Sequence, residues 1–502
     1  MMPSNHITGI QRSTAAEQSL GLQRLAAVCP DVENLREVYY LPVYKPGSKK
    51  SGFKLSWPKE GDKRRAVVTQ GPMISSVPLH QNERSLPKSN DARIINVTSE
   101  DLEVQYRYTA SNYSTLQIPS TWNARILENA EQDLIEYFQS VASRSLSTFG
   151  QDPVKLGQIL LRIAFAGDDN TSSRLAAQQS LLAFSSAHRH NVHSRGTEYK
   201  IAAIKALSDL SGREIGITEA VQHVAAGMLL CAYEMQHSTC TTGHWLIFLC
   251  GTQDIIQITG LDTAHDDPDL VALLDWVYYH NALARFSRQH WHRKEFTGIQ
   301  IAPMRLPGEI FTTETSPLAY IELLSEMCDG AVTPAPSRGS HGDLTDHQNY
   351  LKILDWKIRN LPVTTSGFGF GCDVESKLEL YRLAMLIYLN RASEDTLRQA
   401  ARTQQHVDQG FSILSKLGFC DHQFPVFILG CEARGDGERE EILRLIQRTE
   451  DHGTCRAFNY VKRLLEAFWA QKDLASGGGR DLKYWDQLSD VMSRCAVLPT
   501  FA

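Results

Sequence analysis

The sequence has no hydrophobic run long enough to cross a membrane and no cysteine pair at the spacing that zinc sites favour. Its longest apolar stretch, at 224–233, is about ten residues, whereas a membrane helix needs roughly 20. The ten cysteines are scattered over 502 residues without a C-x-x-C pair. The opening residues lack the charged-then-apolar layout of a secretory signal. These absences argue against a membrane protein, a disulfide-rich secreted protein and a zinc finger.

A strong charge of one sign is also missing. Lys and Arg number 51 against 57 Asp and Glu, which gives a formal net charge of −6. The whole chain is therefore not an electrostatic nucleic-acid binder, and any such role has to be local. With 42% hydrophobic and 22% charged residues, the composition is that of an ordinary globular protein. The length suits one large helical domain or two to three smaller ones.

One local stretch, residues 49–65, is strongly basic. It is punctuated by Pro58 and Gly61 and is too polar to form a core. A run of this kind can contact phosphates or serve as a nuclear import signal, and it can equally be a solvated basic linker. The candidate residues for a nucleic-acid or nuclear-import site are Lys49, Lys50, Lys54, Lys63, Arg64 and Arg65.

The pattern along the chain predicts three segments. Residues 1–51 carry weak periodicity and read as an atypical, disordered N-terminal segment, with one candidate short helix at 15–27. Residues 52–121 read as a linker that is first basic and then rich in Ser and Pro. From 122 to 502, apolar residues recur at helical spacing. The predicted fold is all-α: a large multi-helix domain behind a disordered basic N-terminal region.

Two stretches interrupt this helical pattern. Residues 302–350 read as a break that contains a loop at 334–341. Residues 424–431, "FPVFILGC", form the best strand-like run, but a buried helix that starts after Pro425 fits them equally well. The clearest amphipathic helix lies near the end, where Phe458, Val461, Leu465 and Phe468 share one face.

Histidine and glycine clusters give no convincing catalytic or ligand-binding site. The histidines of "HRHNVH" (188–193) and "HWH" (290–292) could ligate a metal only in a loop, and a polar helix end with a loop explains them better. The glycines of "GFGFGC" (367–372) lack the preceding strand and the spacing of a phosphate-binding loop, so a flexible loop is the preferred interpretation.

Three cysteines, Cys231, Cys240 and Cys250, are close enough in the sequence to suggest a metal-binding cluster. Two of them lie in apolar helical runs, which favours core packing over metal ligation. We therefore expect no catalytic residue, no cofactor site and no metal site in this chain. The sequence gives no reason to expect an enzyme, and an all-α enzyme stays the least favoured of the alternatives.

The C-terminal region carries the clearest resemblance to a known family. "FPVFILGCEARGDGEREEILRLI" (424–446) is followed by a helix that contains Trp469 and Asp473, and then by a closing helix with Trp485 and Met492. This order resembles the fungal zinc-cluster transcription regulators, in the branch that carries the fungal-specific transcription factor domain. The matching positions in the first segment are Pro425, Phe427, Gly430, Cys431, Glu432, Ala433 and Arg439.

The resemblance extends back to about Gly52. A helix pair that carries Glu234, Trp245 and Gly251 is similar to one in the family. The stretch "GFKLSWPKEGDKRRA" (52–66) resembles the segment that follows the family's zinc cluster, which holds six cysteines in roughly 30 residues. Here the upstream residues contain only Cys29, so no zinc cluster is present in the chain as written.

The resemblance implies a nuclear regulator of RNA polymerase II transcription in a fungus that acts through its helical domain. It implies protein partners or a homodimer and no membrane. Sequence-specific DNA binding, with zinc as cofactor, is expected only through a missing zinc cluster before Ser51. The alternative is a protein-interaction paralogue without DNA binding that modulates a zinc-cluster partner. The family places a helix of its zinc module in the major groove of DNA.

Overall fold

In the computed structural model, the described part of the chain is helical. Fifteen α-helices and two short 3-10 helices occur among the described residues, and no strand occurs there. The prediction of an all-α fold is confirmed. The description covers residues 129–501 and leaves out 168–170, 191–194, 210–214, 237–243, 264–266, 292–300, 302–303, 305–317, 329–340, 363–371, 395, 453–457, 479–482 and 496–497.

The predicted segments 1–51 and 52–121 lie outside the described residues, as do the candidate helix at 15–27 and all six candidate basic residues. The first described helix begins at Asn129. Among the described helices, none combines the length and the apolar character that crossing a membrane requires.

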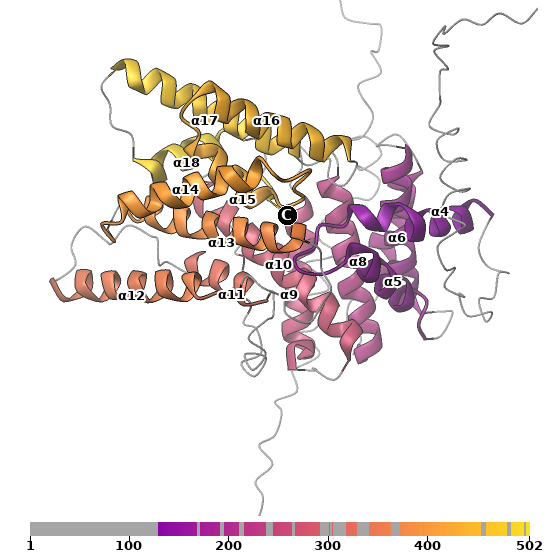
Figure 1. Cartoon of the computed structure of the whole chain (residues 1–502). Coiled ribbons are helices and arrows are strands. Elements are labelled where there is room, and N and C mark those ends of the chain that lie inside the picture. Colours follow the sequence, from indigo (N-terminus) through magenta and orange to yellow (C-terminus); the bar gives the residue numbers. More distant parts are fainter. Residues whose placement is uncertain are drawn as a thin grey trace, which may run out of the picture. The chain divides into compact units, whose positions relative to one another are not determined.

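A first group of helices forms one side of the described region (Figure 1). In it, α6 packs against α7 and α8, and α8 packs against α9. Its members are α4 (Asn129–Ser140), the 3-10 helix η2 (Ala142–Ser145), α5 (Pro153–Ala164), α6 (Ser172–His190), α7 (Gly196–Ser208), α8 (Ile217–Met235), α9 (His244–Thr259) and the 3-10 helix η3 (Leu261–Thr263).

The remaining helices form a second group, in which α13 packs against α14 and α15, and α15 packs against α17. They are α10 (Pro268–His290), α11 (Leu318–Glu326), α12 (His341–Arg359), α13 (Cys372–Ala392), α14 (Ala400–Leu414), α15 (Gln423–Glu432), α16 (Asp436–Asp451), α17 (Phe458–Gly478) and α18 (Tyr484–Ser493).

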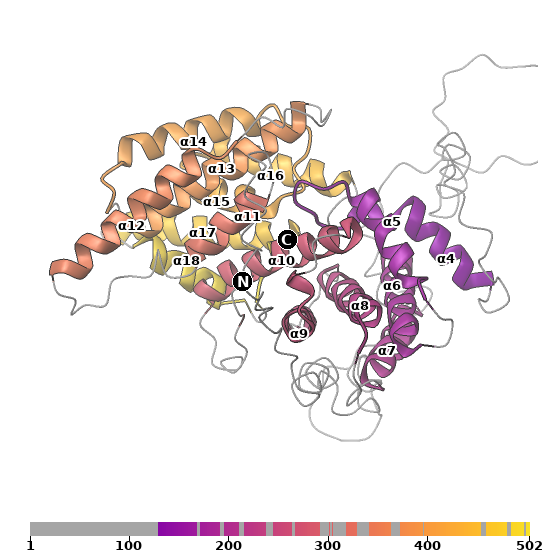
Figure 2. The ribbon, with the colours of Figure 1, turned by 90° about the horizontal axis from the view of Figure 1, so that it is seen from below.

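Helix α10, the first helix of the second group, connects that group to the first. It packs against α5, α8 and α9 of the first group and against α11 and α18 of the second, and Figure 2 shows it between them. Asp267 starts the helix by accepting a hydrogen bond from the Asp269 amide, and Pro268 follows at the first helical position. Residues on every face of α10 are buried, as expected for a helix in the middle of a core.

Aromatic rings strengthen this junction. Phe149, in the segment before α5, stacks on Tyr279 of α10 with ring centroids 5.5 Å apart. It also meets Tyr381 of α13 at 4.7 Å and His422 at 5.4 Å. Aromatic pairs in such offset or edge-on geometries stabilise a core beyond the area that they bury. One side chain from the first group is therefore enclosed by rings of the second.

Helix α15 settles the ambiguity at 424–431 in favour of a helix. All ten of its residues are buried, so its sequence is apolar without the alternation of a half-exposed helix. Pro425 lies in the first turn, where its missing N–H leaves no intrahelical hydrogen bond unmade. The predicted break at 302–350 was wrong in its extent, because α11 lies within it and α12 already begins at His341.

Candidate functional site: the C-terminal motif cluster

The motif residues at 425–439 meet those of α17 in three dimensions. Arg439, in the first turn of α16, donates two hydrogen bonds to Asp473 of α17, with N–O distances of 2.8 and 2.6 Å. The same guanidinium lies over the ring of Trp469, 5.5 Å from the ring centroid. Bidentate pairing and stacking on an aromatic face are properties of arginine that lysine does not share.

The ion pair has an electrostatic signature. The hydrogen bonds from Arg439 lower the pKa of the Asp473 carboxyl, and its positive charge adds to this effect. Asp473 remains 58% exposed while Arg439 is 18% exposed. The carboxylate thus faces solvent, and the arginine is held between it and the indole.

Trp469 connects this ion pair to α15. Its indole N–H donates to the Gly430 carbonyl over 2.8 Å, and both groups are buried. Gly430 permits close approach of the helices, because a Cβ there would lie 2.6 Å from the Leu465 Cδ2 atom of α17. Gly430, Trp469, Arg439 and Asp473 therefore form a continuous set of contacts, which we call the motif cluster.

Glu432 links α15 to α13. It accepts two hydrogen bonds from Arg391, at 3.0 and 2.8 Å, and its side chain is 7% exposed. Its neighbour Cys431 is fully enclosed, and burial raises the pKa of that thiol well above its usual range. A thiol that stays protonated is a poor nucleophile and a poor metal ligand. The predicted motif position Cys431 is thus a packing residue.

The closing helix α18 docks on α10 through a buried histidine. Trp485 lies against His290, with ring centroids 4.3 Å apart. His290 Nε2 is 2.8 Å from the Tyr388 hydroxyl, and Nδ1 is 3.2 Å from Ser489 Oγ. Met492, the other predicted motif residue of this helix, is fully buried. His290, the first histidine of "HWH", takes part in this hydrogen-bond network, a role that the sequence pattern did not indicate.

Glu234 belongs to a second polar centre, which lies in the first group. Glu234 is 3% exposed and accepts a hydrogen bond of 2.5 Å from Lys200 of α7, which is equally buried. The ammonium also lies 5.7 Å from the ring centroid of Tyr233. Burial lowers the pKa of nearby His244, with Glu234 opposing this shift and Lys200 adding to it. Lys200 was missed in the sequence, because nothing local marks it as a buried lysine.

Trp245 also reaches the C-terminal tail, as its indole N–H donates to the Leu498 carbonyl over 3.3 Å. Gly251, the third residue of the helix pair singled out by the resemblance, is buried in α9. The resembling positions within the described residues therefore serve helix packing, through buried side chains, ring contacts or ion pairs that join helices.

The other sequence candidates lie in different helices or outside the described residues. His188, near the end of α6, has its Nδ1 atom 2.9 Å from the Tyr137 hydroxyl. Cys231 lies buried in α8, and Cys250 lies in α9. Residue 193, Cys240 and the stretch 367–371 lie outside the described residues. Within the part of the chain that the structure describes, no three His, Cys, Asp or Glu residues gather where they could share a metal ion.

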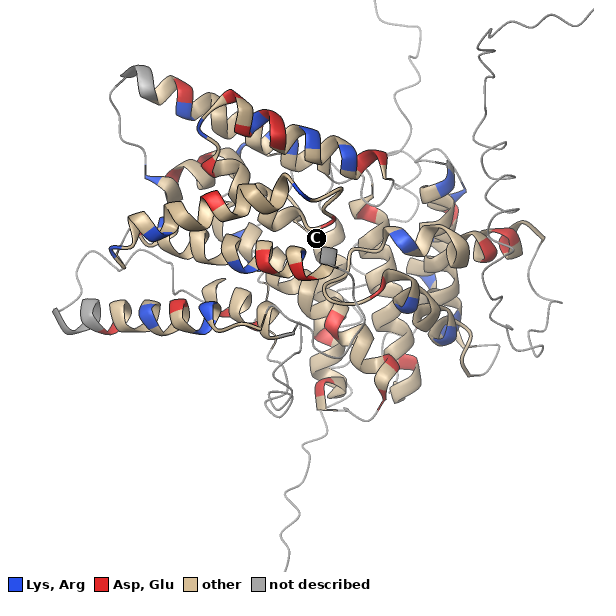
Figure 3. Cartoon of the chain, in the orientation of Figure 1, with Lys and Arg blue, Asp and Glu red and all other residues tan. Residues whose placement is uncertain are grey.

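The arrangement can fix helices relative to one another and present a defined surface. Figure 3 shows residues of both signs side by side along α16 and α17. On α16 alone, Glu440 pairs with Arg444 at 2.6 Å and Arg448 lies 3.8 Å from Glu441. Exposed charges in such alternation differ from the basic stripe that a nucleic-acid interface presents.

Comparison with known proteins agrees with this geometry. The family described as "Fungal specific transcription factor domain" matches residues 133–496. The chain is 40% identical, over 391 residues, to transcription factor iacI of Pestalotiopsis fici, a match that spans 77% of this chain and 100% of that relative. No solved structure matches the chain. The chain belongs to the family of proteins with a fungal-specific transcription factor domain, and it is a transcriptional regulator.

Proposed function

We propose that this regulator acts in a fungal nucleus, on genes transcribed by RNA polymerase II, through protein contacts of its helical domain. The observation that carries the proposal is the family match over 133–496, together with a transcription factor that aligns along its whole length. The ion pairs that join α13 to α15 and α16 to α17 support it, because they hold a rigid helical surface that a partner can bind. We propose no catalytic activity and no bound cofactor.

We assign DNA binding to a zinc cluster that precedes Ser51 and is missing from the 502 residues, and not to the described helices. The mixed charge along α16 and α17 supports this assignment (Figure 3). The alternative function, a protein-interaction paralogue that modulates a zinc-cluster partner, is favoured by one observation: the 502 residues contain no C-x-x-C pair. In that case the partner supplies both the zinc and the contact with DNA.

Chromatin immunoprecipitation of the tagged full chain tests the proposal. Promoter occupancy in otherwise unchanged cells is the expected result. Loss of occupancy when a co-purifying zinc-cluster protein is deleted establishes the alternative. Occupancy that survives such deletions favours a zinc cluster that precedes Ser51 in a longer product of the same gene. Absence from chromatin under all conditions, combined with unchanged transcript levels when the gene is deleted, contradicts both functions.

Nuclear import is a separate part of the proposal, and we assign it to the basic stretch. Replacing Lys49, Lys50, Lys54, Lys63, Arg64 and Arg65 by alanine is expected to shift a fluorescent fusion from nucleus to cytoplasm. The matched control replaces two exposed arginines, Arg444 and Arg494, which are 59% and 64% exposed. Nuclear accumulation that is unchanged in the six-residue variant contradicts the assignment.

A further inference from the structure

Helix α12 buries one face and exposes large apolar side chains on the other. Its inner face is formed by Leu351, Leu354 and Ile358, which are fully buried. On its outer face, Ile353 is 54% and Trp356 is 65% exposed. Both figures locate α12 at the edge of the described helices (Figures 1 and 2). A tryptophan and an isoleucine that share an exposed face are uncommon on the surface of a monomer and typical of interfaces.

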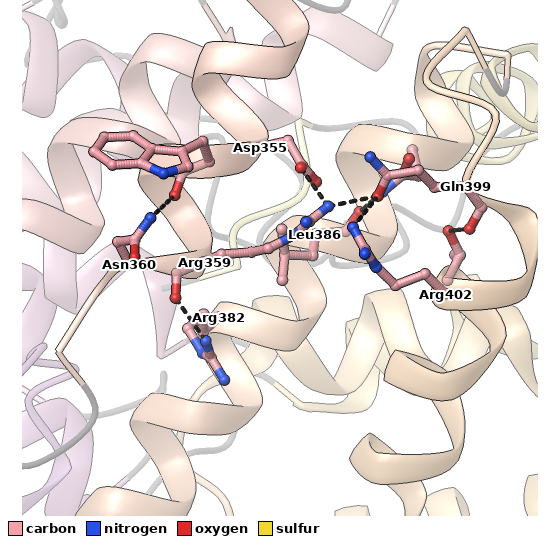
Figure 4. A network of polar contacts seen from close by, with 10 residues as sticks. Asp355, Arg359, Asn360, Arg382, Leu386, Gln399 and Arg402 are labelled. Carbon is pink, nitrogen blue, oxygen red and sulfur yellow. Dashed lines mark hydrogen bonds and ion pairs between the residues drawn. The ribbon is translucent and has the colours of Figure 1, made fainter.

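A polar network anchors α12 from behind. Asp355, which is 4% exposed, pairs with Arg359 one turn further along the helix. Arg359 reaches Gln399 at 2.5 Å, and its carbonyl accepts a hydrogen bond of 2.8 Å from Arg382 of α13 (Figure 4). Ile353 and Trp356 therefore project from a helix whose position is already fixed. Little backbone entropy is lost when a partner binds them.

A second anchor ties α12 to α11. Lys357 Nζ lies 3.1 and 3.0 Å from the two carboxylate oxygens of Glu326, and the Tyr350 hydroxyl donates to Glu326 over 3.2 Å. Lys357 is still 42% exposed, so its ammonium can meet a further carboxylate. The helix is thus held on two sides, with its outer face open among the described residues.

The outer face follows the spacing of a helix-pairing seam. Ile353 and Trp356 are three residues apart, and the exposed Asn349 and Asn360 continue the row at intervals of four. An alternation of three and four residues keeps side chains along one straight stripe of a helix. The row therefore matches what another helix, lying along α12, would cover.

The charges along this face favour a second copy of α12 that lies antiparallel to the first. Asp346, near the start of α12, is exposed, and the exposed lysines Lys352 and Lys357 follow toward its end. Asp346 and Lys357 are eleven residues apart, which is three turns, so they lie on the same side of the helix. A copy of α12 in parallel would place like charges together, whereas an antiparallel copy sets each Asp346 opposite the Lys357 of the other.

We propose that the exposed face of α12 binds the same face of a second copy of this chain, antiparallel and across a twofold axis. In this register Ile353 lies beside the twofold axis, near the middle of the contact, and Trp356 lies next to Lys357 toward each end, where Asp346 of one copy pairs with Lys357 of the other. A contact that is self-complementary in this way is the form that twofold dimers take. The inference rests on the proposed role of the helical domain in protein contacts, and it names the partner.

The size of the surface sets the strength of the dimer. One helix on one helix falls below about 1,200 Å² of total buried area, the range of weak and transient complexes. We therefore expect a dimer that forms at protein concentrations on the order of 10 µM and dissociates on dilution.

Sedimentation velocity of the purified full chain from 1 to 100 µM tests the proposal, with these concentrations chosen to bracket that range. The wild-type chain is expected to shift from monomer to dimer, and the double variant Ile353→Asp and Trp356→Asp is expected to remain a monomer. Leu474→Asp is the matched control, since Leu474 is 79% exposed on α17, and it is expected to dimerise like the wild type. A wild-type monomer at 100 µM, or a dimer that the double variant retains, overturns the proposal.

Zero-length carboxyl–amine cross-linking of the wild-type chain gives a second, variant-free readout. Within one copy, Asp346 and Lys357 are separated by about 16 Å of helix, at 1.5 Å per residue, so they cannot be joined directly. A cross-linked peptide that joins these two residues therefore identifies the antiparallel pair. If the wild-type chain occupies promoters but does not dimerise, only the dimer inference is overturned. If the wild-type chain is absent from promoters, the proposed function is contradicted.

Discussion

Arg439 and Asp473, which are 34 residues apart in the sequence, form a bidentate ion pair that holds α16 against α17. The pair covers Trp469, whose indole in turn donates to the Gly430 carbonyl of α15. Through Trp469, the ion pair of α16 and α17 is thus linked to α15. The family resemblance singles out all four residues, and the structure shows that they share a single physical role.

The arginine is expected to contribute more to stability than its acidic partner. Arg439→Ala removes the ion pair together with the cation–π contact on Trp469, whereas Asp473→Ala removes only the ion pair. In a double-mutant cycle followed by urea unfolding, the effect of Asp473→Ala should shrink when Arg439 is already alanine. Arg439→Lys should recover only part of the loss, because lysine cannot pair in a bidentate manner. Strictly additive single effects would contradict the pairing.

Breaking the buried pair of Lys200 and Glu234 should be far more costly. Both side chains are 3% exposed or less, so Lys200→Met leaves a buried carboxylate without its ammonium partner. We expect a loss of about 3–5 kcal/mol in the free energy of unfolding. The double variant Lys200→Met and Glu234→Met should recover most of it, because a pair of apolar side chains of similar volume needs no charge partner. Denaturant titration of the three proteins measures both quantities. A double variant as unstable as the single one would argue against this account.

Residue patterns in the sequence predicted the features that arise within a single helix. The face formed by Phe458, Val461, Leu465 and Phe468 is buried in α17 as expected, because an amphipathic period of 3.6 residues follows from the geometry of one helix. At α15 the same reasoning left strand and helix open. A segment that is buried on every side has lost the periodicity by which the two are distinguished.

The polar partners could not be predicted from sequence. Glu234 was singled out but Lys200 was not, and Glu432 was singled out without Arg391, which lies 41 residues earlier. His290, treated as part of a polar helix end, is buried against Trp485 and Tyr388. Such pairs are created when distant helices pack, so their signal lies in tertiary structure and not in spacing along the chain.

Acid should destabilise the protein through His223 before most carboxylates titrate. This histidine lies fully buried in α8, and burial lowers its pKa from 6.5 to about 4. Between these values the unfolded chain binds a proton that the folded chain excludes, so the free energy of unfolding falls as the pH falls from 6.5 to about 4. The full effect is on the order of 3 kcal/mol.

The variant His223→Leu should flatten this part of the pH profile while keeping stability near pH 7. Neither ring nitrogen of His223 has a hydrogen-bond partner among the described residues, so leucine forfeits no such bond. The matched control is His452→Leu, at the exposed end of α16. Urea midpoints measured by circular dichroism between pH 4 and 7.5 report the result. A His223→Leu profile that superimposes on the wild type refutes the assignment, and His280, whose pKa is also about 4 through burial, would be tested next.

The C-terminal tail should be as important to stability as the helices that it touches. Phe501 is fully buried, and its ring lies 5.3 Å from that of Phe286 on α10 and 4.8 Å from that of Phe427 on α15. Phe501→Ala leaves a cavity between these helices, and we expect a loss of about 3–5 kcal/mol. Leu474→Ala, at a position 79% exposed, should change stability by less than about 0.5 kcal/mol.

Calorimetry or denaturant unfolding of the full chain compares the two variants. Because Leu498 accepts a hydrogen bond from Trp245 of the first helix group, loosening the tail should also lower protection of the Trp245 indole N–H from hydrogen exchange. A Phe501→Ala protein as stable as Leu474→Ala would show that the tail only rests on the surface. Loss of stability without loss of indole protection would confine its role to the contacts with α10 and α15.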